Sequence, residues 1–364
     1  MARRGHLQHI KLAGYRSIRS LDLQLGPLNI LLGANGAGKS NFISFFKFMN
    51  KLLEKELQLF VRAGLNGADR TLYFGRKVTD ELHIDLHFSP NSYLATMVPT
   101  NDDGLVFKRE QAVFHGDEAG YLGGTKTRDL ASPGATESGL PAAGSGTPAQ
   151  HVARYLQDWK VYHFHDTSDT AKVKGAYSIH ATDRLLSQGE NLAAFLNGIK
   201  DTDSYRRIVQ TVRRVAPYFH DFVFIEEANQ VIRLRWKHSG SEDYFDGTML
   251  SDGTLRFICM ATLLLQPALP TIILLDEPEL GLHPFAMQLL AAMMRSASES
   301  TQIIASTQSV TLANQFGWRD VVVVDQVDNS SVFRRLDEVE VTEWLKEYRI
   351  GDVWEMNALG GTPE

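Results

Sequence analysis

The feature that most constrains this chain is a glycine-rich loop set between an apolar segment and an amphipathic one. Residues 28–32 form a nearly continuous apolar run, which predicts a strand buried on both faces. The loop at residues 33–40 follows directly and has the pattern Gly-x-x-x-x-Gly-Lys-Ser. From Asn41 to Lys51, polar residues recur at helical spacing beside a broad apolar face. Strand, glycine loop and helix in this order predict an α/β fold with a phosphate-binding loop.

The loop supplies ligands that a nucleoside triphosphate needs. Its backbone amides and the start of the helix form a nest for anions, and glycine lets the backbone approach the phosphates closely. We expect Lys39 to reach the terminal phosphates and the Ser40 hydroxyl to bind Mg²⁺. A glycine turn that arose by chance is the alternative, but it does not explain the flanking strand and helix. The predicted cofactors are ATP and Mg²⁺, and the predicted loop ligands are Gly33, Ala34, Asn35, Gly36, Ala37, Gly38, Lys39 and Ser40.

A second motif carries two carboxylates at the end of an apolar strand. The strand predicted at residues 271–275 begins with Thr271 and is otherwise apolar. Asp276 and Glu277 follow it directly. We expect these side chains at the rim of the sheet, beside the loop. Asp276 is predicted to hold Mg²⁺ through water, because Mg²⁺ retains much of its hydration shell. Glu277 is predicted to orient and deprotonate the attacking water. The alternative is an acidic turn that only caps a core strand.

A third segment, Leu-Ser-Asp-Gly-Thr at residues 250–254, precedes a predicted buried helix at 255–265. Ser251 and the amides at this helix start could donate to a phosphate, but not readily to the loop of their own chain. Taken alone, the segment is a common turn and helix cap.

The order of these motifs resembles the ABC-type ATPases, specifically the SMC and RecF branch. In that family, a Leu-Ser-x-Gly segment of one subunit, called the signature segment, contacts the nucleotide bound by the other; here it would be residues 250–254. Residues 279–284 are similar to the family's D-loop, and residues 14–18 to the strand and turn that precede its loop. Nearest of all is the resemblance to a group of stand-alone bacterial predicted ATPases, through residues 159–168 and 251–257.

The resemblance implies further site residues and a homodimer that closes around two ATP molecules. Arg16, Ser17, Asn41, Ser251 and Gly253 would contact the nucleotide. The catalytic residues would be Lys39, Glu277 and Gln308.

Two departures from the family pattern matter. The family's switch histidine is replaced by Gln308, which can donate a hydrogen bond but cannot carry charge, so we expect slow hydrolysis. The glutamine of the Q-loop is absent from its usual place, where the order of motifs instead offers residues 165–168.

From these patterns we expect a two-lobed P-loop domain: an ABC-type ATPase head with a helical second lobe and an antiparallel β edge. One lobe would hold the loop, the acidic strand and the β edge, and the other would present Ser251. The expected segments are residues 1–116 with the loop, a low-complexity mobile insertion at 117–150, the end of the first lobe at 151–180, a helical lobe at 181–250, the signature helix and acidic strand at 251–340, and a tail at 341–364.

The remaining elements follow from periodicity. Additional strands are predicted at residues 21–25, 81–88, 159–165, 222–226, 231–236, 302–305 and 321–324, and additional helices over 183–217 and after Pro284. Trp344 and Trp354 are expected to pack the tail onto the domain.

Composition limits the partners and the compartment. The chain has 364 residues, a single cysteine and a formal net charge of -6, and no apolar run approaches the length of a membrane span. We therefore expect a cytoplasmic protein that does not enter the membrane. The basic pairs at 108–109, 206–207 and 213–214 are candidates for nucleic-acid contacts, although solvated surface charge is the simpler interpretation. His163 and His165 could belong to a metal site, but a polar wall of the nucleotide site is favoured.

Three biological roles stay open. The first is a DNA-associated ATPase that acts in repair or in defence against foreign DNA. The second is an ATP-sensing subunit that controls a partner effector protein and does not bind DNA itself. The third is a transporter motor, which Gln308 and the context of Asn41 disfavour.

Overall fold

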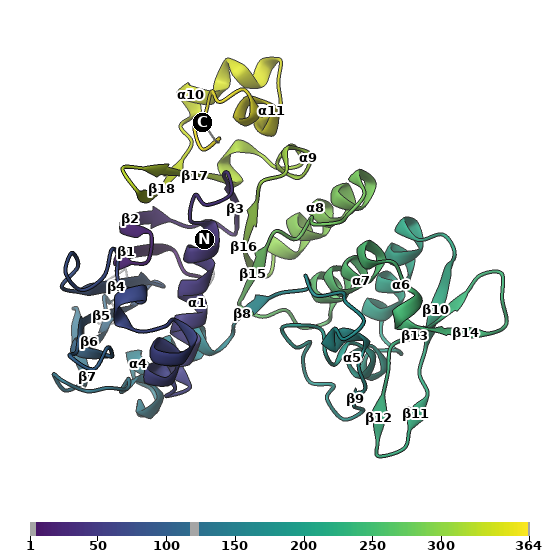
Figure 1. The fold of residues 1–364 in the computed structure, drawn as a ribbon, viewed down its shortest axis with the longest axis horizontal. Helices are drawn as coiled ribbons and strands as arrows, with labels where there is room; N and C mark the ends of the chain where they lie inside the picture. The colour runs from purple at the N-terminus through teal and green to yellow at the C-terminus, as the bar shows by residue number, and fades with distance from the viewer. Residues whose placement is uncertain (1–4, 117–123, 363–364) are drawn as a thin grey trace. The chain divides into compact units, whose positions relative to one another are not determined.

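The computed structural model describes residues 5–116 and 124–362. The chain divides into two units, residues 1–159 with 317–364 and residues 160–316. Each unit is described by itself below, with the labels of Figure 1.

An antiparallel sheet of six strands dominates the first unit (Figure 1). Its order is β2-β1-β4-β5-β6-β7, so four of the strands come from one meander. The register pairs Leu12 with both Leu21 and Ile84, which gathers apolar side chains on one face. The strands are β1 His9–Tyr15, β2 Ile18–Gln24, β4 Leu82–His87, β5 Asn91–Pro99, β6 Leu105–Phe114 and β7 Lys126–Ala131.

Helices α1 (Lys39–Leu53) and α4 (Pro148–Gln157) pack against this sheet through aromatic side chains. The ring of Tyr15 in β1 meets Phe45 of α1 edge-on, with centroids 5.7 Å apart. Phe88, which follows β4, lies 5.4 Å from the ring of Tyr155 in α4. Because aromatic contacts add to the burial of large apolar surface, these pairs help to hold α1 and α4 against the sheet.

A second group of strands in the first unit carries the loop. Strand β3 (Leu28–Leu32) runs parallel to β17 (Val321–Val327), which pairs antiparallel with β18 (Ser330–Arg335). All five residues of β3 are buried, which confirms the prediction of a strand covered on both faces. In the tail, Trp354 is packed as expected at 6% exposure, whereas Trp344 is 41% exposed.

The expectation of a mobile insertion at 117–150 is wrong for residues 124–150; residues 117–123 lie outside the described part. Strand β7 pairs with β6 along its length. The buried carboxylate of Glu110 accepts hydrogen bonds from the Tyr93 hydroxyl at 2.8 Å and the Gly139 amide at 2.9 Å, and also from Ser138. Composition does not report such a polar anchor, so a segment rich in small residues was misjudged.

The second unit combines helices with three small groups of strands (Figure 1). Its helices are α5 Leu192–Gly198, α6 Asp203–Val215, α7 Asp252–Leu265, α8 Pro284–Ser298 and α9 Val310–Ala313. Its strands are β9 Tyr177–Ser178, β10 Phe219–Val223, β11 Glu226–Glu227, β12 Val231–Ile232, β13 Arg235–His238, β14 Tyr244–Asp246, β15 Ile272–Asp276 and β16 Gln302–Thr307. Strand β8, Trp159–Tyr162, spans the boundary of the units.

Two sequence expectations change here. The acidic strand β15 belongs to the second unit, together with the signature helix α7, and not to the unit that holds the loop. The predicted helical stretch 183–217 is two helices, and the lobe predicted to be helical also contains the sheet β10-β13-β14.

Short helical turns complete the chain. They are α2 Leu57–Leu59, a π-helical turn Phe60–Gly64, α3 Ala68–Thr71, α10 Glu338–Thr342 and α11 Ile350–Glu355, with 3₁₀ turns at Leu140–Ala142, Lys172–Lys174, Gly247–Met249, Trp318–Asp320 and Trp344–Lys346.

Substituting Gly139 tests whether residues 124–150 are built into the first unit. A Cβ atom there would lie 1.8 Å from the carbonyl oxygen of Leu130, so Gly139→Ala should destabilise the protein. We expect a loss of about 1–3 kcal/mol in urea denaturation, the usual cost of overpacking. Gly124→Ala is the matched control, because no described atom lies within 4 Å of its Cβ position. Equal effects of the two changes would contradict this packing.

Candidate nucleotide-binding site

The glycines of the loop are needed for two different reasons, close packing at the ends of the loop and an open backbone at its tip. A Cβ atom on Gly33 would lie 2.2 Å from the carbonyl oxygen of Val324 in β17, and one on Gly38 would lie 1.9 Å from the Ser331 hydroxyl. Gly36, in contrast, has a φ of +82° and no described atom within 4 Å of its Cβ position. Packing therefore requires glycine at both ends of the loop, while its tip leaves an open backbone that a ligand can approach.

The start of α1 is suited to an anion. Gly38 at the N-cap has a φ of 110° and provides no side-chain cap, and the first turn contains no acidic residue. The amides of this turn and the positive end of the helix dipole thus meet no competing side-chain acceptor from the helix itself. Lys39 is only 5% exposed, and its ammonium donates to the carbonyl oxygens of Gly33 at 2.6 Å and Ala34 at 2.8 Å. Ser40 is exposed, and Asn35 lies on the exposed tip of the loop.

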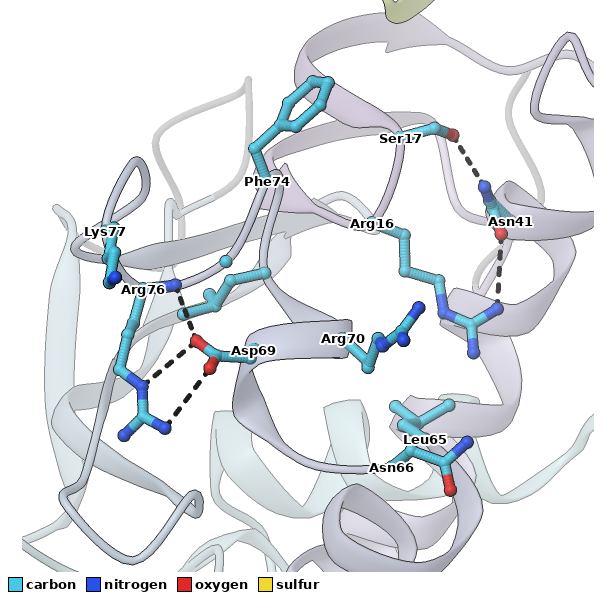
Figure 2. Close-up of a pocket in the computed structure, with 12 residues that line it drawn as sticks. Arg16, Ser17, Asn41, Leu65, Asn66, Asp69, Arg70, Phe74, Arg76 and Lys77 are labelled. Carbon is cyan, nitrogen blue, oxygen red and sulfur yellow. Dashed lines mark hydrogen bonds and ion pairs between the residues drawn. The ribbon is translucent and has the colours of Figure 1, made fainter.

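Three further predicted ligands lie together beside the loop (Figure 2). The Asn41 side chain donates to the Ser17 hydroxyl at 2.7 Å and accepts from the Arg16 guanidinium at 3.2 Å. The Ser331 hydroxyl also donates to Ser17 at 2.7 Å. The turn between β1 and β2 is thereby tied to the first turn of α1.

These residues form one wall of an open pocket of about 1220 Å³. The opposite wall contains four residues that the sequence analysis missed, Arg70, Phe74, Arg76 and Lys77. Arg76 is held by Asp69, with Nε–Oδ1 and amide–Oδ1 distances of 3.0 Å, and the hydrogen bonds from its backbone amide and then its guanidinium lower the pKa of that carboxyl. Arg70 makes no hydrogen bond or ion pair within the described chain, and Figure 2 shows its guanidinium directed toward that of Arg16.

Phe74 gives the pocket an aromatic edge. Its side chain is 61% exposed and its backbone adopts a φ of 53°, which is unusual for a bulky residue. Residues held in sparsely populated backbone conformations cluster at binding and active sites, so the strain at Phe74 marks this edge as a candidate binding surface. The sequence signal for this wall was limited to three basic residues, Arg70, Arg76 and Lys77, within residues 70–77.

In the second unit, the two carboxylates follow β15 as predicted. Asp276 pairs in register with Ser306 of β16, and the Ser306 hydroxyl donates to its Oδ1 at 2.5 Å. The Glu277 amide donates to the same hydroxyl at 3.1 Å, and Glu277 has a φ of 43°. Since a left-handed conformation is costly for a residue with a Cβ atom, the turn is held by these bonds to β16.

The signature segment starts helix α7. Ser251 is the exposed N-cap, and its hydroxyl accepts from the Thr254 amide at 3.3 Å. A Cβ atom on Gly253 would lie 2.6 Å from the carbonyl oxygen of Gly281, which explains the glycine there by packing against residues 279–284. The Arg256 guanidinium strengthens that contact, donating to the carbonyls of Leu280 at 2.9 Å and His165 at 2.7 Å. Arg256 falls within the range 251–257 of the family resemblance, which gave it no role of its own.

Gln308 follows β16, directly after the buried Thr307. Thr307 donates to Glu279, a carboxylate that the sequence analysis did not single out. Burial raises the pKa of Glu279 to about 6, and the nearby Glu277 adds to this rise. The backbone turns that carry Glu277 and Gln308 therefore lie next to the hydrogen bonds made by Ser306 and Thr307, at the ends of β15 and β16.

The structure gives less support to the other candidate features, namely the histidine metal site and the basic pairs. No group of three metal-ligating side chains occurs among the residues that the structure describes, so His163 and His165 form no such site there. On α6, Arg206 forms an ion pair with Asp203, and Arg213 donates to the backbone of His220. Within the described ranges, no helix is long and apolar enough to cross a membrane.

Comparison with known proteins identifies the family. A family model described as "AAA domain, putative AbiEii toxin, Type IV TA system" matches residues 28–314, well over half of the chain. The chain belongs to this family of P-loop ATPases. The matched range includes the loop, the signature segment, the acidic strand and Gln308.

This AAA-domain protein also has a curated relative and structural neighbours. It is 22% identical over 377 residues to the Old nuclease of Escherichia phage P2, covering 93% of this chain but only 62% of that protein's length. Two Smc head structures share its fold: a SmcHead bound to the C-winged helix domain of ScpA (TM-score 0.54, 15% identity) and an Smc head with an extended coiled coil bound to the C-terminal domain of ScpA from Pyrococcus furiosus (TM-score 0.51, 14% identity). These matches cover 92% and 94% of this chain and 99% of each head.

The raised pKa of Glu279 predicts a pH-dependent effect of Glu279→Gln on stability. The folded state disfavours the charged carboxylate, so the wild type loses stability as the pH rises from 4.5 through about 6. The neutral glutamine escapes this loss. Between pH 4.5 and 7.5, the variant should gain roughly 2 kcal/mol relative to wild type in urea denaturation, since one pKa unit corresponds to about 1.4 kcal/mol. A difference that stays constant with pH would contradict the burial of a charged Glu279.

Proposed function

We propose that this protein binds ATP with Mg²⁺, hydrolyses it slowly, and closes as a homodimer around two nucleotides. The observation that supports this most strongly is the uncapped start of α1, whose first turn has no acidic side chain and whose Lys39 ammonium is held against the loop carbonyl of Gly33. Membership of the AAA-domain family supports the same assignment for the whole range 28–314.

The proposed roles follow the chemistry of each side chain. The amides of Gly36, Ala37 and Gly38 and the ammonium of Lys39 bind the phosphates. Ser40 and Asp276 hold Mg²⁺, which typically takes one or two protein ligands beside phosphate and water oxygens. Glu277 accepts the proton of the attacking water.

The pocket beside Asn41 is proposed to take the rest of the nucleotide. Its cationic side chains, Arg16 and Arg70, suit the phosphate and ribose oxygens, since a guanidinium presents several donors in a fixed plane. The exposed ring of Phe74 suits a base, which it can contact with its face.

A second copy of the chain is proposed to complete each site. Ser251 is exposed at the start of the 14-residue helix α7, so its hydroxyl and the first amides of the helix can meet a phosphate from outside. Met249, Leu280 and Phe285, from the segments adjoining this helix start and the D-loop-like region, are large apolar side chains that are also exposed. Their exposure is consistent with a surface that a partner chain covers.

For the biological role, we favour DNA maintenance or defence against foreign DNA. The relationship to the phage P2 Old nuclease supports it, whereas the net charge of -6 gives no general attraction for DNA. The alternative is an ATP-sensing subunit that controls an effector protein. This chain spans only 62% of that nuclease's length.

Two substitutions separate binding from hydrolysis. Lys39→Ala should abolish both ATP binding and turnover, because the phosphates lose their ammonium. Glu277→Gln should keep ATP affinity within about twofold while turnover falls by roughly 10²-fold or more, as expected when a general base is lost. Nucleotide binding by fluorescence and phosphate release would measure the two effects. Full turnover in either variant would contradict the assigned roles.

DNA binding distinguishes the two biological roles. If the protein acts on DNA, its affinity for duplex DNA or DNA ends should rise with ATP and fall steeply with salt, because bound phosphates release counterions. ATPase activity should then change when double-stranded DNA, single-stranded DNA or DNA ends are added. No binding at low salt with ATP present would reject the DNA role and favour control of an effector protein.

A further inference from the structure

Two buried polar anchors stand side by side at the ends of β15 and β16 in the second unit. The first joins Ser306 to Asp276 and to the amide of Glu277. The second joins Thr307 to Glu279, with 2.5 Å between the threonine Oγ1 and the carboxylate Oε1. Ser306 and Thr307 are both fully buried, and Glu279 is 6% exposed. The proposed function accounts for the first anchor but gives the second no role.

The Thr307 hydroxyl is used both as a hydrogen-bond donor and as an acceptor. It donates to Glu279 and accepts from the backbone amide of Ser309 at 3.0 Å. The Ser309 hydroxyl in turn accepts from the Leu312 amide at 3.2 Å and caps helix α9. Gln308 therefore lies between two residues whose side chains are fixed by hydrogen bonds, and the chain around it has little freedom to rotate.

The Gln308 side chain itself is left available. Its amide makes no hydrogen bond to any residue that the structure describes, and the residue is half-buried. The backbone amide of Gln308 lies close enough to the Glu279 carboxylate to oppose the rise of its pKa. A free side chain on a fixed backbone is the arrangement that pre-organised contacts to a ligand require.

The buried carboxylate of Glu279 is energetically unfavourable for the folded protein. Its Oε2 is buried without a hydrogen-bond partner among the described residues, and an unpaired buried carboxylate oxygen carries a desolvation penalty. A neutral side chain could fill the same space. The carboxylate does offer a stronger acceptor for Thr307 than a neutral group, because charge-assisted bonds are shorter and stronger.

We propose that Glu279 and Thr307 are positioning residues that hold Gln308 in place for hydrolysis and contribute little to the binding of ATP. The proposal rests on the ATPase function proposed above. It assigns the second anchor a role parallel to the first: Ser306 holds the turn of Glu277, and Thr307 holds the turn of Gln308.

Removing the Thr307 hydroxyl tests the proposal. Thr307→Val keeps the shape of the side chain and should lower kcat about tenfold, because a small misplacement of a catalytic group is costly, while ATP affinity stays within about twofold. Thr307→Ser keeps the hydroxyl and should stay near wild-type kcat. If the valine does not fold, Thr307→Ala removes the same hydroxyl without a branched methyl group that must fit.

The matched control is Thr301→Val. Thr301 is also fully buried, and it lies at the opposite end of β16 from Gln308. Its hydroxyl donates to the carbonyl oxygens of Pro270 and Thr271. It should lose a similar amount of stability and leave kcat unchanged. Equal losses of kcat in both valine variants would overturn the proposal, since the effect would then be structural.

A double-mutant cycle with Gln308→Ala identifies the path of the effect. If Thr307 acts through Gln308, Thr307→Val should change kcat by less than twofold in the Gln308→Ala background. A full tenfold loss there would overturn the proposal.

Lys39→Ala distinguishes failure of the proposed ATPase function from failure of the positioning role. If Lys39→Ala leaves turnover intact, the proposed function fails; if it abolishes turnover while Thr307→Val has wild-type kcat, only the positioning role fails.

Discussion

The first unit depends on the close approach of the loop backbone to β17 and β18. Gly33 meets the carbonyl of Val324, and Gly38 meets the Ser331 hydroxyl, at distances that exclude a side chain. These contacts set where α1 begins, and the aromatic packing of Tyr15 on α1 sets its direction. The amides of the first helical turn are therefore fixed in place by packing before any ligand arrives, which lowers the entropic cost of binding.

In the second unit, hydrogen bonds hold the turns that follow β15 and β16 in place. Glu277 and Gln308 both follow buried parallel strands, where a turn must leave the sheet and still present a side chain. The Ser306 hydroxyl ties the turn of Glu277 to β16, and the Thr307 hydroxyl links the end of β16 to Glu279 in the turn after β15. Arg256 ties the start of α7 to residues 279–284. Holding the turns that carry the proposed catalytic residues at the ends of rigid strands is an expected feature of a precise site.

Much of the framework followed from local sequence patterns. The apolar run at 28–32 and the loop after it were enough to predict β3 and α1, because the signals are local and strong. The pocket wall at Arg70 to Lys77 and the anchor at Glu279 were missed, since each depends on residues brought together from distant segments. Order in residues 124–150 was missed for the same reason: Glu110 lies well before the segment it anchors, and composition does not register a single buried carboxylate.

The central claim, that two chains share each ATP site, is tested most directly by subunit complementation. Lys39→Ala removes the loop side of the site, and Ser251→Arg blocks the signature side; each variant alone should be inactive. In an equal mixture, half of the dimers would hold one intact site of two, so turnover should recover to about a quarter of the wild-type value. A mixture as inactive as its components, or full activity in Ser251→Arg alone, would contradict the account.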